Sequence, residues 1–378
     1  MGYFNNASIQ QESKSMIKKF FRYVGIYGIN RTVIKSLGRL KSRFPIWPFF
    51  IFKFPNLHKK KVGIIGCGQF SYSSITYYLI KSNKAKIIWC CDLDIKAAES
   101  LAKSYGIKKY FIEVGLNYKS VDLVYIATNH SSHSQYAIES LHSGCDVYIE
   151  KPMVTDWKQL ELIKKAKDET GKNIFIGYNR PFSPGLRKIK KLSVAFDKPF
   201  TLSCFITGHF LDEDHWYRDD REGTRICGNV GHWLDLSIHI LSWRHKMPNF
   251  IDISINYSNL QTPSDNIAIA LITSEGDLIN ITFSTRGEPF EGVGETINFQ
   301  QENLIAKIDD HRKTKIWLEK KLYEYSHWPK NVGHKEAIFQ PFDKVIKRDW
   351  EEILISTKLM LTITDMVKDN NKNYRFNL

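Results

Sequence analysis

Short apolar runs alternate with helical patterns over the first half of the chain, from about residue 61 onward. Each run is apolar on both faces, and most are followed by a segment in which apolar residues recur at helical spacing. The predicted strands are 61–66, 86–91, 121–128, 146–150 and 173–178, and the predicted helices are 71–82, 95–105, 132–143 and 156–170. Strands buried on both faces and returned by helices form a parallel sheet that helices cover on both sides. This half therefore predicts a doubly wound Rossmann sheet.

The pattern changes after about residue 181, where longer runs alternate apolar and polar residues between turns rich in Gly, Ser, Asp and Pro. Such alternation indicates antiparallel strands with one buried face. The predicted segments are strands at 250–257, 266–273 and 277–284, with helices at 229–243 and 345–368. The predicted fold class is α/β: an N-terminal Rossmann doubly wound parallel sheet, followed by an α+β domain with a mainly antiparallel open sheet.

A chain of 378 residues is long enough for more than one hydrophobic core. The predicted parts are a basic, aromatic N-terminal arm with amphipathic helices (1–58), a Rossmann dinucleotide-binding domain (59–180), an α+β substrate and oligomerisation domain (181–344), and a C-terminal segment (345–378) whose helix packs back near the Rossmann domain. Because an antiparallel sheet with one open face suits self-association, we expect a homo-oligomer, either a dimer or a tetramer.

Most of the net charge of +14 belongs to the arm. Residues 1–61 hold 13 Lys or Arg and a single acidic residue, Glu12, whereas the rest of the chain holds 41 basic and 39 acidic residues. A near-neutral body argues against a nucleic-acid-binding core, and no nucleic-acid motif accompanies the charge. We therefore expect no nucleic-acid partner.

The arm combines apolar and basic positions at helical spacing. The apolar positions are Ile17, Phe20, Phe21, Val24, Val33, Ile34, Leu37 and Leu40, and the basic ones are Lys18, Lys19, Arg22, Arg31, Lys35 and Arg39. This pattern is typical of an amphipathic helix, here expected to break at Gly25 and Gly28. Two interpretations stay open: residues 13–54 bind an anionic membrane surface, or the arm clamps a partner subunit.

Cysteine usage indicates a reducing compartment. The six cysteines (Cys67, Cys90, Cys91, Cys145, Cys204 and Cys227) form no C-x-x-C pair, and several lie in apolar runs, where a thiol packs as a small hydrophobic group. We expect no metal site. No apolar stretch reaches the roughly 20 residues that span a bilayer, and no secretory signal is recognised. The expected location is cytoplasmic, with a peripheral position on the cytoplasmic membrane face if the arm binds lipid.

The run V-G-I-I-G-C-G-Q-F-S (62–71) predicts a dinucleotide site. Gly66 and Gly68 follow a strand and open a helix, so the backbone can approach a pyrophosphate at the helix N-terminus. Ser71 stands where a third Gly or Ala is usual. Asp92 ends the second strand, where a carboxylate accepts hydrogen bonds from a ribose 2′-hydroxyl and repels a 2′-phosphate. The expected cofactor is NAD rather than NADP.

Two later strand ends carry further motifs. The predicted strand 121–128 runs into I-A-T-x-x-x-x-H (126–133), and the predicted strand 146–150 ends in E-K-P (150–152). Together with G-Y-N-R-P-F-S-P (177–184) and G-H-W-L-D-L (231–236), these motifs make residues 61–370 similar to the Gfo/Idh/MocA oxidoreductase family. The resemblance implies hydride transfer between a sugar or polyol carbon and a nicotinamide, with Lys151 and His232 near the reacting hydroxyl.

The resemblance and the glycine turn together imply a set of site residues. The expected catalytic residues are Lys151, His232 and Asp235. The expected cofactor-binding residues are Gly66, Gly68, Gln69, Phe70, Asp92, Thr128, Asn129, His133, Glu150 and Lys151. The expected substrate-binding residues are Tyr178, Arg180, Trp216, Tyr217, Arg218 and Asn229. His232 has an ordinary pKa near 6.5, which suits proton exchange with an alcohol, and the Lys151 ammonium stabilises alkoxide character.

Three of these assignments leave alternatives. Asp235 either orients the His232 imidazole from one helical turn away or faces the core. The segment 216–218 either lines the substrate pocket or is a packed loop. Many members of the family have an aspartate four residues before the histidine, and this chain has Gly228 there, so either His232 and Lys151 suffice for catalysis or oxidation is compromised.

The function expected from the sequence is NAD-dependent oxidation or reduction of a sugar, most specifically a nucleotide-linked sugar in bacterial surface-polysaccharide or lipopolysaccharide synthesis. One alternative is a redox-assisted elimination of the glycosidase-like kind, in which the hydride returns to the substrate. The other is a non-catalytic NAD-binding sensor or scaffold at the membrane, which the absence of the aspartate favours.

Overall fold

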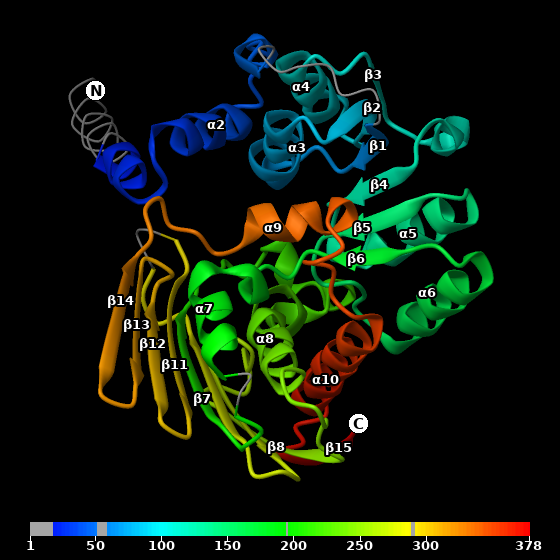
Figure 1. Cartoon of the computed structure of the whole chain (residues 1–378). Coiled ribbons are helices and arrows are strands. Elements are labelled where there is room, and N and C mark those ends of the chain that lie inside the picture. The colour runs from blue at the N-terminus through cyan, green and yellow to red at the C-terminus, as the bar shows by residue number, and fades with distance from the viewer. Residues whose placement is uncertain (1–17, 51–58, 194–195, 289–291) are drawn as a thin grey trace, which may run out of the picture.

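The protein is built around two β-sheets (Figure 1). The structure, a computed structural model, describes residues 18–50, 59–193, 196–288 and 292–378. The first sheet is six-stranded with the order β3-β2-β1-β4-β5-β6, and the second is nine-stranded with the order β14-β13-β12-β11-β7-β10-β9-β8-β15. All neighbours in the first sheet are parallel, and only β7 and β10 pair in parallel in the second. The predicted fold class is confirmed.

The strands of the first sheet agree closely with the apolar runs of the sequence. They are β1 (Lys60–Ile65), β2 (Ala85–Cys91), β3 (Lys109–Phe111), β4 (Leu123–Ile126), β5 (Asp146–Ile149) and β6 (Ile174–Ile176). The strand order reverses between β1 and β4, which are neighbours in the sheet. In such sheets a ligand lies outside the carboxyl ends of the strands at this reversal, so the glycine turn after β1 and the segment after β4 face the same crevice.

Helices connect these strands at the predicted places. They are α3 (Tyr77–Ser82), preceded by the π-helical η2 (Ser71–Thr76), then α4 (Ile95–Tyr105), α5 (His133–His142) and α6 (Trp157–Thr170), with short turns η3 (Gly115–Ser120) and η4 (His130–Ser132). Two begin at aspartate caps: Asp94 accepts a hydrogen bond from a backbone N–H of α4, and Asp156 accepts one from α6. Such caps satisfy the free N–H groups of a helix start.

The second sheet comprises β7 (Thr201–Thr207), β8 (Phe250–Tyr257), β9 (Ile267–Thr273), β10 (Leu278–Ser284), β11 (Gly294–Gln301), β12 (Leu304–Asp309), β13 (Lys313–Leu318), β14 (Lys321–Ser326) and β15 (Asn373–Asn377). Its helices are α7 (Pro184–Ser193), α8 (Gly231–Leu241), α9 (His334–Phe339) and α10 (Trp350–Lys368), with short elements η5 (Arg180–Phe182), η6 (Trp216–Arg218), η7 (Asp220–Glu222), η8 (Ile226–Val230) and η9 (Gln340–Phe342). Alternation along the strands buries one side: Ile279, Ile281 and Phe283 of β10 are buried in the core.

Several elements were not predicted from the sequence. These are β3, β7, β11–β15, α7 and α9. The final helix begins at Trp350 rather than at residue 345, because Asp349 caps it by accepting from the N–H groups of Glu351 and Glu352. The chain then returns into the second sheet, where β15 pairs with β8.

The arm packs on its own chain. A helix over residues 18–27 is followed by α2 (Ile29–Arg39) and η1 (Trp47–Phe50). Figure 1 shows α2 beside α3 of the Rossmann domain. The expected break at Gly25 is wrong, because that residue lies within the helix; the helix ends at Gly28, whose φ of +76° suits glycine. These contacts test neither lipid binding nor a subunit clamp, and both stay predictions. Within the described ranges, no helix is long and apolar enough to cross a bilayer. The arm's predicted positions before residue 18 and at 51–58 lie outside the described residues.

Candidate active site

The glycine turn lines a large cavity, whose volume is about 1410 Å³. Gly66 has a φ of +87°, and a Cβ there would lie 2.3 Å from the backbone oxygen of Ala127. Gly68 lines the cavity with nothing within 4 Å of a Cβ position. Ser71, at the third motif position, donates its hydroxyl to the Gly66 carbonyl oxygen at 2.5 Å. The turn therefore needs glycine at residue 66 and is fastened by the serine.

The Asp92 carboxylate is fixed at the edge of this turn. It accepts a hydrogen bond from the backbone N–H of Cys67 at 2.6 Å and another from that of Asp94 at 2.8 Å. Asp92 also lines the cavity. A carboxylate accepts about four hydrogen bonds, so lone pairs remain for ligand hydroxyls. Gly68 leaves open space and Asp92 offers acceptors, so these residues fit a dinucleotide with an unmodified ribose.

The other predicted cofactor residues fall into two groups. Gln69, Phe70, Thr128 and Asn129 line the cavity. His133 is buried, and its ring nitrogens lie 2.7 Å from the Pro152 carbonyl oxygen and 3.1 Å from that of Thr128. Burial lowers its pKa to about 4. His133 thus joins the ends of β4 and β5 rather than facing the cavity.

Glu150 also lies behind the cavity wall. It is partly buried, and its carboxylate accepts the hydroxyl of Tyr148 at 2.9 Å. Burial raises its pKa to about 7, against the opposing effect of the Lys151 ammonium. A Cβ at Gly177 would lie 2.6 Å from the Glu150 carboxylate, so the glycine of the G-Y-N-R motif makes room for this acid.

Lys151 is held by a backbone group. Its ammonium donates a hydrogen bond to the carbonyl oxygen of Gly228 at 2.6 Å. Among the described residues it is not one of those lining the cavity, but its charge contributes to lowering the pKa of His232 and of His130. The Lys151 charge therefore acts on the predicted catalytic histidine, while the ammonium itself is hydrogen-bonded to the backbone of Gly228.

His232 lies near the start of α8 and lines the cavity. Its ring centroid is 5.7 Å from that of Tyr178, and its Nδ1 is buried without a hydrogen-bond partner among the described residues. Burial, followed by the charge of Arg180, holds its pKa well below the usual value. The imidazole is therefore neutral at pH 7 and able to accept a proton.

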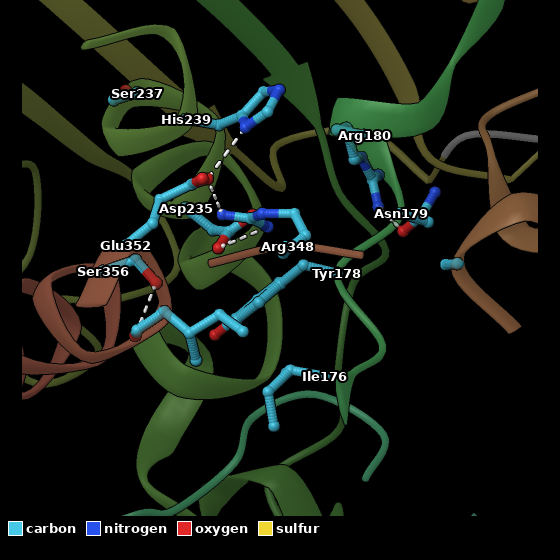
Figure 2. A network of polar contacts seen from close by, with 12 residues as sticks. Ile176, Tyr178, Asn179, Arg180, Asp235, Ser237, His239, Arg348, Glu352 and Ser356 are labelled. Carbon is cyan, nitrogen blue, oxygen red and sulfur yellow. Dashed lines mark hydrogen bonds and ion pairs between the residues drawn. The ribbon is translucent and has the colours of Figure 1, made fainter. Parts of the chain in front are cut away.

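Asp235 does not orient this imidazole. Both of its carboxylate oxygens accept hydrogen bonds from Arg348, at 2.8 and 3.0 Å. Arg348 also pairs with Glu352, which lies 2.8 Å from Nδ1 of His239 (Figure 2). The network joins α8 to α10. Of the two interpretations of Asp235, the core position is the one observed, and its assignment as a catalytic residue is corrected.

The predicted substrate residues also divide. Arg180, Trp216, Tyr217 and Asn229 line the cavity, with Arg180 paired to Glu295 at 3.1 Å. Tyr178 is buried and directs its hydroxyl to the sulfur of Met360 at 3.4 Å. Arg218 pairs with Asp265 at 3.0 Å. These last two stabilise the cavity wall and are not among its lining residues.

The structure gives a reason for the glycine at residue 228. A Cβ there would lie 2.7 Å from the ring of Tyr217 and 3.1 Å from that of His130. The two rings pack together with centroids 4.8 Å apart. Tyr217 therefore occupies the space that a side chain at residue 228 would need.

Comparison with known proteins agrees with the geometry of the glycine turn. Residues 60–178 match the family model GFO_IDH_MocA, described as an oxidoreductase family with an NAD-binding Rossmann fold. A solved Gfo/Idh/MocA family oxidoreductase from Vibrio cholerae shares the fold over 82% of this chain and 99% of its own, with a TM-score of 0.66 at 18% identity. Residues 60–178 therefore form the NAD-binding Rossmann domain of the Gfo/Idh/MocA oxidoreductase family.

Individual proteins similar to this chain are distant. Glucose-6-phosphate 3-dehydrogenase of Bacillus subtilis is 25% identical over 54% of this chain and 60% of its own length. The WlbA dehydrogenase of Bordetella pertussis, solved with NADH and UDP-GlcNAcA, has a TM-score of 0.65 at 20% identity, covering 85% of this chain and 99% of that one. The Chromobacterium violaceum WlbA, solved with the same ligands, gives 0.68 at 18% identity, covering 87% and 99%.

One wall of the cavity was not predicted from the sequence. Five arm residues line it: Tyr23, Tyr27, Arg31, Lys35 and Arg39. The basic positions at spacing of four were visible in the sequence, but their helical periodicity gave no information on which surface they face. Lys330, His334 and Lys335, which precede or begin α9, line the cavity as well.

Proposed function

We propose that this Gfo/Idh/MocA protein is an NAD-dependent oxidoreductase that transfers a hydride between a sugar hydroxyl carbon and the nicotinamide, and that the sugar is nucleotide-linked. The observation that carries the proposal is a shared cavity. The glycine turn and Asp92 line the same cavity as His232, Arg180 and Asn229. The two WlbA dehydrogenases, which were solved with NADH and UDP-GlcNAcA, support the nucleotide-linked sugar, and surface-polysaccharide synthesis remains the predicted pathway.

In this proposal the bound nicotinamide dinucleotide supplies the hydride acceptor or donor. Gly66 and Gly68 leave room for its phosphates, and Asp92 holds the ribose hydroxyls. His232, which burial and the charges of Arg180 and Lys151 keep neutral, takes the hydroxyl proton of the sugar, and the negative charge that develops on the bound sugar offsets these effects on the imidazole. Lys151 contributes positive charge near the oxygen on which negative charge develops.

A specific observation favours a second candidate. The Lys151 ammonium is bound to the Gly228 carbonyl oxygen, and the space of the family's aspartate is filled by Tyr217. Both features suit a protein that binds NAD without turnover, as a sensor or scaffold. Catalysis requires either that Lys151 acts from this position through its charge or that it exchanges partners when substrate binds.

The test is a screen of free and nucleotide-linked sugars with NAD⁺, read as the absorbance of reduced nicotinamide. We expect turnover with at least one sugar, lost by about a hundredfold or more in His232→Asn and Lys151→Met, with NADH affinity retained in both. His142→Asn, on the exposed α5 surface, is the matched control. NADH binding without turnover of any sugar contradicts the proposal and favours the scaffold. Sugar conversion without net NADH formation indicates the redox-assisted elimination.

All six cysteines are buried and unpaired, which supports the predicted reducing compartment. The oligomeric state remains a prediction. It is supported by apolar side chains on the open face of the second sheet: Ile305, Trp317 and Leu322 are 48%, 36% and 51% exposed on three adjacent strands, and each is directly paired with the next. Surface rows of this kind mark association sites more often than isolated apolar residues do.

A further inference from the structure

The arm connects both domains above the cavity. The Trp328 side chain donates to the carbonyl oxygen of Gly25 at 2.7 Å, and the backbone N–H of Lys330 donates to that of Ile26 at 2.8 Å. On the Rossmann side, the Arg31 guanidinium donates to the Ser73 carbonyl and to the Ser74 hydroxyl. These contacts fix the helix at 18–27 and α2 across the mouth of the cleft.

Three basic side chains of α2 line this cleft. Arg31, Lys35 and Arg39 are spaced by four residues, so they lie along one face of the helix, and all three line the cavity that also contains the glycine turn. Arg31 and Lys35 are partly buried at this cavity, whereas Arg39 lines it from an exposed position. The outer surface of the arm instead exposes apolar side chains, including Phe21 at 68% and Leu40 at 79%.

The partners that the structure gives to the inner two cations are neutral. Arg31 contacts a carbonyl, a hydroxyl and the rings of Tyr77 and Tyr78. The Lys35 ammonium lies 4.3 Å from the ring centroid of Tyr27 and 5.7 Å from that of Tyr23. Ring contacts of this kind position a cation without neutralising it.

Lys35 is partly buried, and among the described residues it has no acidic partner. Burial and the charges of Arg31, Arg39 and Lys330 lower its pKa to about 8. Lys330 is itself paired with Asp310 at 2.5 Å. A buried charge without a counterion is costly, and a cluster of such cations in a cavity is typical of a site for an anionic ligand.

We propose that the arm forms a phosphate-binding wall of the active site, in which Lys35, with Arg31 and Arg39, binds the phosphate groups of a small molecule held in the cleft. The inference rests on the proposed function for the identity of that cleft. The phosphates belong either to the nucleotide part of the sugar substrate or to the dinucleotide, and both present the same pyrophosphate chemistry.

The membrane alternative makes a different demand on these residues. An arm bound to anionic lipid through its basic face would have to withdraw Arg31 and Lys35 from the cavity and release the contacts at Gly25 and Ile26. The cavity-lining arrangement favours a small anion, and vesicle binding is therefore an outcome that the experiment must separate.

The experiment measures equilibrium binding of UDP, inorganic pyrophosphate and NADH to the full-length protein by titration calorimetry. The variants are Lys35→Met, Lys35→Arg and Arg39→Gln, with Lys18→Met as the control on an exposed arm position. Loss of a charge-assisted hydrogen bond predicts about a tenfold weaker Kd for Lys35→Met. We expect Lys35→Arg to bind within about threefold of the original protein and Lys18→Met to be unchanged. Arg39→Gln, at an exposed position, provides a second test should Lys35→Met be poorly folded by circular dichroism.

The ligands separate the two sources of phosphate. Weaker UDP and pyrophosphate binding with unchanged NADH binding assigns the site to the substrate, and a parallel loss for NADH assigns it to the cofactor. Unchanged Kd values for all three ligands in both Lys35→Met and Arg39→Gln overturn the proposal, as does an effect seen only with vesicles of anionic phospholipid. No turnover is needed in these titrations, so a failed sugar screen leaves their result intact.

Discussion

The Lys151 ammonium lies 2.6 Å from the carbonyl oxygen of Gly228 and donates a hydrogen bond to it. This bond joins the end of β5 to the π-helical segment that leads into α8, so the Rossmann domain and the helix carrying His232 are held together by the residue expected to take part in catalysis. Lys151 contacts the backbone carbonyl of residue 228 rather than a side chain, because the Tyr217 ring leaves no room for a side chain at that residue.

We expect Gly228→Asp to destabilise the protein rather than to restore the family's aspartate. Overpacking of this kind costs about 1–3 kcal/mol, because the new Cβ would lie 2.7 Å from the Tyr217 ring. In a Tyr217→Ala background the space is open, and the cost of Gly228→Asp should fall by most of that amount. Chemical denaturation of the two single variants and the double variant gives the coupling energy. Additive effects of the two substitutions would show that Tyr217 is not the obstacle.

Five of the six strands of the Rossmann half could be predicted because they form buried apolar runs, whereas β3 is short and mostly exposed. The positions of Gly66, Gly68 and Asp92 followed from the same local order. The role of Asp235 did not, since its partner Arg348 is 113 residues away in the chain. The direction of the arm's basic face was likewise undetermined, because helical periodicity places Lys35 on a face but does not say what lies opposite.

We expect Asp92 to determine the preference for NADH over NADPH. We expect Asp92→Ala to weaken NADH binding by about tenfold and to reduce the preference for NADH over NADPH, because the acceptor for the ribose hydroxyl and the repulsion of a 2′-phosphate are both lost. The matched control is Asp122→Ala, whose carboxylate also accepts a backbone N–H, that of Lys61 at 2.8 Å. Fluorescence titration with both reduced cofactors measures the ratio. An unchanged ratio in Asp92→Ala would show that another group selects the cofactor.

We expect Arg348 to contribute strongly to the free energy of unfolding. Arg348→Met leaves the carboxylates of Asp235 and Glu352 buried without their guanidinium, and loss of one partner of a buried ion pair costs about 3–5 kcal/mol. Arg375→Met is the control, since Arg375 pairs with Asp252 on the surface, where such a pair contributes about 1 kcal/mol or less. The midpoints of urea denaturation compare the two. Equal losses would mean that the network of Figure 2 contributes no more than a surface pair.

The buried carboxyl group of Glu150 predicts a pH-dependent stability. Burial raises its pKa to about 7 in the folded protein, from an ordinary value of 4.5. Between these two pH values the folded state holds a proton that the unfolded state has released, so the contribution of this group to stability falls as the pH rises from about 4.5 to about 7 and is constant above that. The shift corresponds to a loss of about 3 kcal/mol over that interval.

Glu150→Gln removes this titration while keeping the size of the side chain. We expect the difference in the free energy of unfolding, Glu150→Gln minus the original protein, to increase between pH 5 and pH 7 and to level off at higher pH. The variant thus becomes more stable relative to the original protein over that interval. Glu161→Gln, an exposed residue of α6, should follow the original protein throughout. Urea denaturation at intervals of pH measures the three curves. Parallel curves for Glu150→Gln and the original protein would show that Glu150 ionises normally, and hence that the wall behind Lys151 is more accessible to water than its burial indicates.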